Sequence, residues 1–251
     1  MKRKNSKKPL RQRERSSVNY RKIAFLLIPI FILVSIILLI NYSKTDSYFN
    51  VKAIRITGNY YLTPEEVFKE TGLQPGININ TVKTAEIQKR LIFHPRIRSA
   101  KVIKEYPDQI LIKIEEVRQI ALFRDASGLN EFSENGHVFP ARKGVTEFDN
   151  PVLSGVSVDS DEFKLLRREM VNFITVLKNK TGLFNFVSEV DFSFKHHIQV
   201  NLTSGRVALL RKDEYPFDLR RLEILLKSVN IEDRNIIDLR FSNRAFLRES
   251  I

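Results

Sequence analysis

The stretch IAFLLIPIFILVSIILLI, Ile23 to Ile40, decides how this chain is organised. It runs for 18 residues without a charged side chain, and Ser35 is its only polar residue. At 1.5 Å per residue, a helix of this length is roughly 27 Å long, close to the ~30 Å hydrocarbon core of a bilayer. Pro29 lies inside the stretch, and transmembrane helices tolerate proline. The pattern predicts a membrane-spanning helix over residues 23–42.

Two other interpretations of this stretch are less consistent with the sequence. A buried core helix rarely carries more than about 14 uninterrupted apolar residues. A cleavable signal peptide has an apolar stretch of about 7–15 residues followed by a small-x-small cleavage site. Here the stretch is longer and continues into Asn41-Tyr42-Ser43 without an Ala-x-Ala sequence. We therefore favour an uncleaved membrane anchor.

The charge of the chain is concentrated before the anchor. Residues 1–22 contain ten Lys/Arg and a single acidic residue, Glu14, so they carry +9 of the formal net charge of +13. A basic arm of this density could bind nucleic acid. Its position beside the span favours instead a cytoplasmic tail that orients the helix, because positive charge stays inside. Residues beyond the span are then expected outside the cytoplasm.

The residues after a polar linker, 43–48, predict an α+β domain over residues 49–117. A strand is expected from Phe49 to Ile56, and Gly58-Asn59 ends it. Thr63-Pro64-Glu65-Glu66 has the pattern of a helix start, with Thr63 as the cap and Glu66 able to close a capping box. The remaining elements are a helix over residues 84–93 and strands near residues 99–104 and 110–115. The order is β-α-α-β-β.

A second domain of mixed β-sheet with two helices is predicted over residues 118–251. Asn135-Gly136 is a strong hairpin signal between two short strands. Pro151 to Gly155 is interpreted as a turn. Helices are expected over residues 161–178 and, after Tyr215-Pro216-Phe217, up to about Val229. The strands are expected at residues 187–194, 198–202, 207–210, 236–241 and 245–248.

The sequence contains no recognisable catalytic or cofactor motif. It lacks the glycine-rich phosphate loops, the G-x-S-x-G elbow and the H-E-x-x-H zinc motif. Its zero cysteines exclude thiol catalysis and every cysteine-based metal site. The adjacent pair His196-His197 would point to opposite faces of a strand and cannot readily chelate one metal. We expect no enzyme activity, no cofactor, no metal and no small-molecule substrate.

The last segment of the chain offers a surface for a partner protein. Ile237 to Arg248 reads as a hairpin whose outer strand can be a free edge of the sheet. Edge strands expose unpaired backbone N–H and C=O groups to which another chain can add a strand. The alternative is an edge blunted by Arg244 and Arg248 that binds nothing. Composition alone does not separate the two.

Several motifs, in this order, resemble a known family. Five stretches of the sequence resemble the FtsQ-type POTRA domain. They are Phe49-Asn50-Val51-Lys52-Ala53-Ile54-Arg55-Ile56-Thr57-Gly58-Asn59, Thr63-Pro64-Glu65-Glu66-Val67, Gly76-Ile77-Asn78-Ile79, His94-Pro95-Arg96-Ile97-Arg98-Ser99-Ala100-Lys101-Val102 and Tyr106-Pro107-Asp108-Gln109-Ile110. Glu134-Asn135-Gly136-His137-Val138-Phe139 and Asp238-Leu239-Arg240-Phe241 are similar to the β domain of the same family. The whole chain thus resembles the FtsQ/DivIB family of bacterial cell-division proteins.

The resemblance implies a scaffold of the divisome in the cytoplasmic (inner) membrane at the septum. Such proteins link early cytoplasmic division proteins to the septal peptidoglycan synthase complex. Their β domain binds FtsB/FtsL-like coiled-coil proteins beside the terminal strand, which corresponds here to Arg244, Ala245, Phe246, Leu247 and Arg248. The POTRA surface implicated in recruitment corresponds to Ala100, Lys101, Val102, Ile103 and Lys104.

The chain also departs from the family pattern. Family members often have Pro-Trp-Val where Pro95-Arg96-Ile97 stands here, and Phe241 replaces a frequent Tyr. The alternative functions are another POTRA-containing membrane protein, acting as a chaperone or secretion accessory, and an envelope hydrolase with an unrecognised site. Depletion followed by microscopy separates them, since loss of a division protein produces filaments.

Overall fold

The computed structural model describes residues 20–45, 47–228 and 235–249. Most of the predicted basic tail, residues 1–19, and the predicted helix end at Val229 lie outside the described residues. The chain divides into two compact units. The first comprises the described parts of residues 1–53, 75–82 and 105–109, and the second those of residues 54–74, 83–104 and 110–251.

The first unit contains the predicted anchor as helix α1, Tyr20–Thr45. Its apolar part, Ala24–Ser43, is 0% buried by the rest of the protein, which suits a helix whose side chains face lipid. Short 3-10 turns η1, Ser47–Phe49, and η2, Ile79–Thr81, follow along the chain. The expected strand start at Phe49 was therefore wrong, because this residue ends a 3-10 turn and strand β1 begins only at Ala53.

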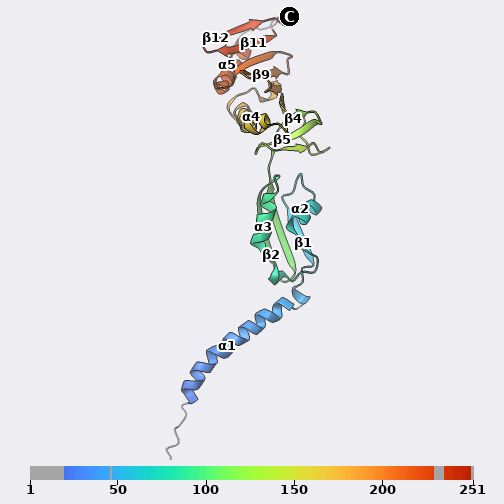
Figure 1. Ribbon diagram of the computed structural model, residues 1–251, viewed down its shortest axis with the longest axis vertical. Coiled ribbons are helices and arrows are strands. Elements are labelled where there is room, and N and C mark those ends of the chain that lie inside the picture. Colours follow the sequence, from blue (N-terminus) through green and yellow to red (C-terminus); the bar gives the residue numbers. More distant parts are fainter. Residues whose placement is uncertain (1–19, 46, 229–234, 250–251) are drawn as a thin grey trace, which may run out of the picture. The chain divides into compact units, whose positions relative to one another are not determined.

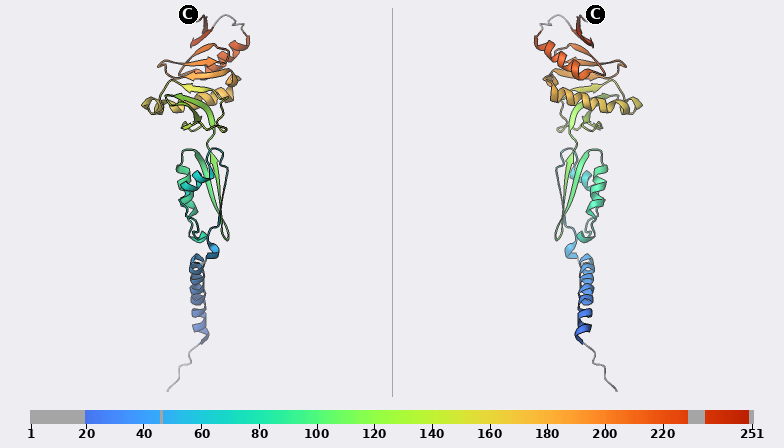
Figure 2. Two further views of the ribbon diagram at one scale, coloured as in Figure 1. Left: turned by 90° about the vertical axis from the view of Figure 1, so that its right-hand side faces the viewer. Right: turned by 90° about the vertical axis from the view of Figure 1, so that its left-hand side faces the viewer.

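A three-stranded sheet with two helices confirms the predicted β-α-α-β-β order. Its elements are β1, Ala53–Thr57; α2, Pro64–Thr71; α3, Thr84–Phe93; β2, Ile97–Glu105; and β3, Gln109–Glu116. The strand order is β1-β3-β2, so β2 is an edge. Both helices lie on one side of the sheet (Figure 2). Thr63 caps α2 and forms the predicted capping box with Glu66, while Gly72 ends the helix at φ +63°.

A nine-stranded mixed sheet forms the C-terminal part of the chain (Figure 1). Its strands are β4, Gln119–Asp125; β5, Gly128–Ser133; β6, Val138–Pro140; β7, Val152–Ser154; β8, Val187–Asp191; β9, His197–Leu202; β10, Val207–Arg211; β11, Ile236–Phe241; and β12, Arg244–Arg248. The order is β12-β11-β10-β9-β8-β7-β4-β5-β6. The pairs β4–β7, β7–β8 and β10–β11 are parallel and the others antiparallel.

Two helices, α4, Asp161–Lys180, and α5, Tyr215–Ser228, pack together against this sheet. Along α4, Phe163, Met170, Phe173 and Leu177 are buried in the core, and Leu166 packs against its border. The second helix contributes Leu219 and Leu222 to the same core. The fold is the predicted α+β arrangement of an apolar helix, a small α/β sheet domain and a mixed sheet.

Two local predictions in this part were wrong. The segment from Pro151 to Gly155 is not only a turn, because Val152–Ser154 form β7 between β4 and β8. A strand of three residues between two parallel neighbours is stabilised by burial, and Leu153 is fully buried. Tyr215-Pro216-Phe217 does not precede α5 but forms its first turn, where a proline needs no N–H partner.

Candidate partner-binding edge

The five residues predicted to bind a partner form one strand at the end of the nine-stranded sheet. Strand β12 pairs antiparallel with β11, with Ile237 opposite Leu247 and Asp238 opposite Phe246. No other strand of the described residues pairs with its outer side. Its side chains alternate, so that Arg244, Phe246 and Arg248 are exposed while Ala245 and Leu247 pack on the core.

An aromatic pair marks the exposed face of this hairpin. The rings of Phe241 and Phe246 lie 4.9 Å apart at 72°, an edge-to-face contact. They retain 48% and 39% of their exposure. The pair therefore presents apolar surface beside an open strand edge.

Helix α5 holds the turn of the hairpin through one arginine. The guanidinium of Arg221 donates to the carbonyl oxygens of Phe241 at 3.0 Å and of Arg244 at 2.9 Å. It also donates to the fully buried carboxylate of Asp218 at 3.1 Å. Asp218 in turn accepts three hydrogen bonds from Arg211, one of them at 2.6 Å. The position of β12 thus depends on a polar network in α5 and β10.

A second carboxylate stabilises the exposed face of the same two strands. Asp238 is fully buried beneath Arg240, which donates to it at 2.7 and 2.9 Å, and Arg248 lies at 3.5 Å. These hydrogen bonds, led by that of the Arg240 side chain, lower the pKa of Asp238. Charged side chains along β12 are therefore partly engaged within the hairpin.

The second predicted surface, Ala100 to Lys104, lies on strand β2, an edge of the three-stranded sheet. Lys101 is exposed, Ala100, Ile103 and Lys104 are half-buried, and Val102 faces the core. The N–H of Val102 donates at 2.9 Å to the side chain of Gln88 on α3. This edge is less open to strand addition than β12, because part of its backbone already has a partner.

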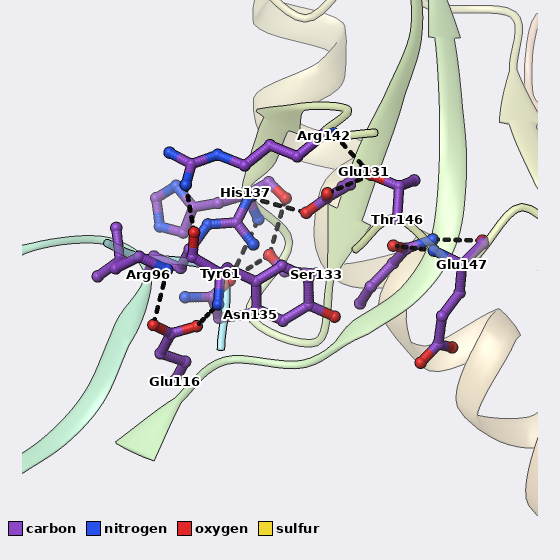
Figure 3. Close-up of polar contacts among 12 residues, drawn as sticks. Tyr61, Arg96, Glu116, Glu131, Ser133, Asn135, His137, Arg142, Thr146 and Glu147 are labelled. Atoms are coloured by element: carbon purple, nitrogen blue, oxygen red, sulfur yellow. Dashed lines mark hydrogen bonds and ion pairs between the residues drawn. The ribbon is translucent and has the colours of Figure 1, made fainter. Parts of the chain in front are cut away.

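A buried arginine, Arg96, joins the two sheets of the second unit (Figure 3). The sequence did not predict this role. Arg96 is 3% exposed, and its guanidinium forms an ion pair at 2.8 Å with Glu131, which is 0% exposed. The guanidinium lies 4.5 Å from the ring centre of Tyr61 and 3.9 Å from that of Phe139. Thr146 donates to the other Glu131 oxygen at 2.5 Å.

Further contacts surround this ion pair. Arg142 donates to the carbonyl oxygen of Tyr61 and at 2.9 Å to the carboxylate of Glu66. Asn135 donates to the carbonyl of Pro95 at 3.0 Å. The sequence signal that could have indicated this contact is Arg96 itself, which stands where members of the resembled family often have a tryptophan.

An anchor helix, a β-α-α-β-β domain and a mixed sheet define a membrane-anchored POTRA protein, and the family model described as POTRA domain, FtsQ-type, matches residues 49–116. The cell division protein DivIB of Bacillus anthracis is 25% identical over 233 residues, 91% of this chain and 83% of that relative. The cell division protein FtsQ of Syntrophotalea carbinolica is 31% identical over 111 residues, 44% of this chain and 39% of that relative. Residues 49–116 thus match an FtsQ-type POTRA domain, and most of the chain is similar to DivIB cell division proteins.

A solved structure is also similar to part of the chain. The major extracytoplasmic domain of DivIB from Geobacillus stearothermophilus, in its trans isomer, is 19% identical with a TM-score of 0.33. The match covers 46% of this chain and 99% of that one.

Proposed function

We propose that this chain is a non-enzymatic scaffold of the bacterial division complex. It links early cytoplasmic division proteins to the septal peptidoglycan synthase complex through protein–protein contacts. Its N-terminus lies in the cytoplasm and its folded domains lie outside, at the septum. The family relationship, the anchor α1 and the +9 charge of residues 1–22 support this assignment. We divide the chain into tail 1–22, span 23–42, linker 43–48, POTRA domain 49–117 and β domain 118–251.

The observation that carries the proposal is the open edge of β12. An FtsB/FtsL-like partner adds a strand beside Arg244–Arg248, using backbone hydrogen bonds for affinity. The exposed pair of Phe241 and Phe246 supplies the apolar contact that fixes the register of the added strand. Arg244 and Arg248 face outward and favour an acidic partner segment.

The contacts of Arg221 make it a positioning residue for this edge. It binds the backbone on both sides of the β11–β12 turn without reaching the outer side of β12. We expect Arg221→Met to weaken partner binding by loosening the hairpin.

The binding experiment uses the full-length protein in detergent and its FtsB/FtsL-like partners from the same organism. We expect Phe246→Glu to reduce their co-purification at least about tenfold, since a charge replaces a central apolar contact. The matched control is Phe148→Glu, because Phe148 is similarly exposed at 57% but lies between β6 and β7. Equal binding by the two variants would reject the strand-addition site.

Amide hydrogen exchange distinguishes strand addition from side-chain contact alone. If a partner strand pairs with β12, exchange across residues 244–248 slows in the complex, because their outer N–H groups gain acceptors. Binding without such protection contradicts β addition.

The surface Ala100–Lys104 is proposed to recruit the protein to the division site. Lys101, its exposed member, is the residue to test, and Lys101→Glu is expected to reduce septal localisation of a fluorescent fusion. A diffuse envelope signal for the unaltered protein in dividing cells would favour a POTRA-containing chaperone or secretion accessory instead.

A further inference from the structure

The last turn of α1 is joined to a loop that lies 35 residues further along the chain. The carbonyl oxygen of Ser43 accepts hydrogen bonds from the side-chain amides of Asn78 and Asn80, both at 3.0 Å. Carbonyls at the end of a helix lack partners within the helix, so these amides satisfy one of them. Ser43 is also the last residue of the apolar span. These hydrogen bonds hold the loop of residues 75–82 next to the end of the span.

Two further segments of the same unit are tied to this loop and to each other. The backbone N–H of Val51 donates to the carbonyl of Ile77 at 2.9 Å. The N–H of the next residue, Lys52, donates at 2.8 Å to the carbonyl of Asp108, in the turn between β2 and β3. Residues 47–53, 75–82 and 105–109 thus form one connected group of loops at the end of the span.

Three exposed tyrosines belong to this unit. Tyr42, Tyr48 and Tyr106 retain 69%, 60% and 61% of their exposure; they lie in α1, in η1 and in the turn between β2 and β3. Tyrosine is enriched at membrane–water interfaces, because its ring is apolar and its hydroxyl can remain in water. Tyr42 lies in the last turns of the span itself, close to the level at which the span ends.

The charge of these loops does not provide an electrostatic attraction to lipid. Lys52 is the only cation among the described side chains of residues 47–53, 75–82 and 105–109. Its ammonium forms an ion pair with Asp108 at 2.9 Å. Contact with a bilayer then depends on the tyrosine rings rather than on net positive charge.

We propose that Tyr42, Tyr48 and Tyr106 form a tyrosine seat in the phospholipid headgroup layer at the outer end of α1. The seat rests on zwitterionic lipid through its aromatic rings. It fixes the loops of residues 75–82 and 105–109 against the bilayer surface, with the Ser43 carbonyl as the link to the span.

The chain contains no tryptophan, so single tryptophans placed in the seat are the only indole reporters. Full-length Tyr48→Trp and Tyr106→Trp variants are reconstituted in phosphatidylcholine vesicles whose acyl chains carry bromine near the headgroups. Tyr42→Trp, on α1, is the positive control. Tyr60→Trp is the reference, because Tyr60 is similarly exposed at 64% but belongs to the second unit.

We expect Tyr48→Trp and Tyr106→Trp to emit at shorter wavelength than Tyr60→Trp. Bromolipid should quench them to at least about half the extent found for Tyr42→Trp, because an interfacial indole lies near the upper acyl chains. Replacing part of the lipid with phosphatidylglycerol, or adding salt to about 0.5 M, should leave the quenching unchanged, because charge does not hold the seat.

Two results would overturn the seat. In one, both variants behave like Tyr60→Trp, with water-exposed emission and no quenching by bromolipid. In the other, quenching appears only with phosphatidylglycerol at low salt, which indicates electrostatic attraction. Circular dichroism of each variant verifies that the fold is retained, and the two independent substitutions keep the test valid if one of them misfolds.

Discussion

Replacing Arg96 with alanine tests how the two sheets of the second unit are held together. The Arg96 side chain is 4% exposed and that of Glu131 1%, with 2.8 Å between the paired nitrogen and oxygen. In Arg96→Ala the Glu131 carboxylate stays buried and keeps, among the described residues, only the hydroxyl of Thr146 as a side-chain hydrogen-bond partner. The variant thus leaves an uncompensated charge in the protein interior.

The expected loss of stability is large. Removing one partner of a buried ion pair typically costs about 3–5 kcal/mol, because the remaining charge is not solvated. The contacts of the guanidinium with the rings of Tyr61 and Phe139 add of the order of 1 kcal/mol. We therefore expect at least about 3 kcal/mol, more than a hundredfold in the ratio of folded to unfolded protein.

The chain provides a matched control two residues away. Arg98 pairs with Glu115 at 3.1 Å and with Glu134, but its side chain is 41% exposed. Because exposed ion pairs contribute about 0–1 kcal/mol, Arg98→Ala should change the free energy of unfolding by no more than about 1 kcal/mol. Urea unfolding of full-length protein in detergent, followed by far-ultraviolet circular dichroism, measures both variants under the same conditions.

A double variant completes the test. In Arg96→Met with Glu131→Leu, both charges are removed and apolar side chains take their place, so most of the lost stability should return. Equal destabilisation by Arg96→Ala and Arg98→Ala would refute the reasoning. So would a double variant as unstable as the sum of its single changes, because the cost would then not arise from an unpaired buried charge.

Three further predictions concern the POTRA domain. Hydrogen bonds from Arg142, and next from the backbone of Thr63, lower the pKa of Glu66 from 4.5 to about 2. This carboxylate therefore stabilises the fold above pH 4.5 and loses that effect as the pH falls toward about 2; Arg142→Ala should flatten the acid side of a thermal-melting profile. Thr63→Ala removes the cap of α2 and should cost about 0.5–2 kcal/mol in urea unfolding, against no change for Thr63→Ser. Gly58→Ala should destabilise by more than about 1 kcal/mol, because φ is +84° and the new Cβ would lie 2.0 Å from the carbonyl oxygen of Ile114; an unchanged midpoint would contradict this.

Local patterns predicted the elements and the edge strand but not the contacts between distant residues. The capping box at Thr63 and the alternation along Arg244–Arg248 are visible within a few residues, and both are present in the structure. By contrast, Arg96 and Glu131 are 35 residues apart, and nothing in either local pattern indicates burial of a charge. Strand β7 was missed because three residues carry too little periodicity to be distinguished from a turn.

The predicted binding residues illustrate the same limit. The sequence placed Phe246 on an outer strand, yet Phe241 joins it only through the register of the β11–β12 hairpin. The hydrogen bonds from Arg221 to the backbone of the β11–β12 turn depend on how α5 packs on the sheet. No spacing along the chain predicts this packing. Residues that position a site are therefore harder to predict than residues that line it.

The stacking of Arg96 on Phe139 has a consequence for self-association. Phe139 lies in β6, the opposite end of the nine-stranded sheet, a strand of three residues that ends at Pro140. Proline has no N–H to offer, and the arginine covers the neighbouring ring, so this end is a poor template for another strand. Among the described strands, β12 is therefore the better template of the two ends of this sheet. Copies of the protein therefore cannot readily join end to end into a continuous ribbon, because each sheet has one end that is a poor template.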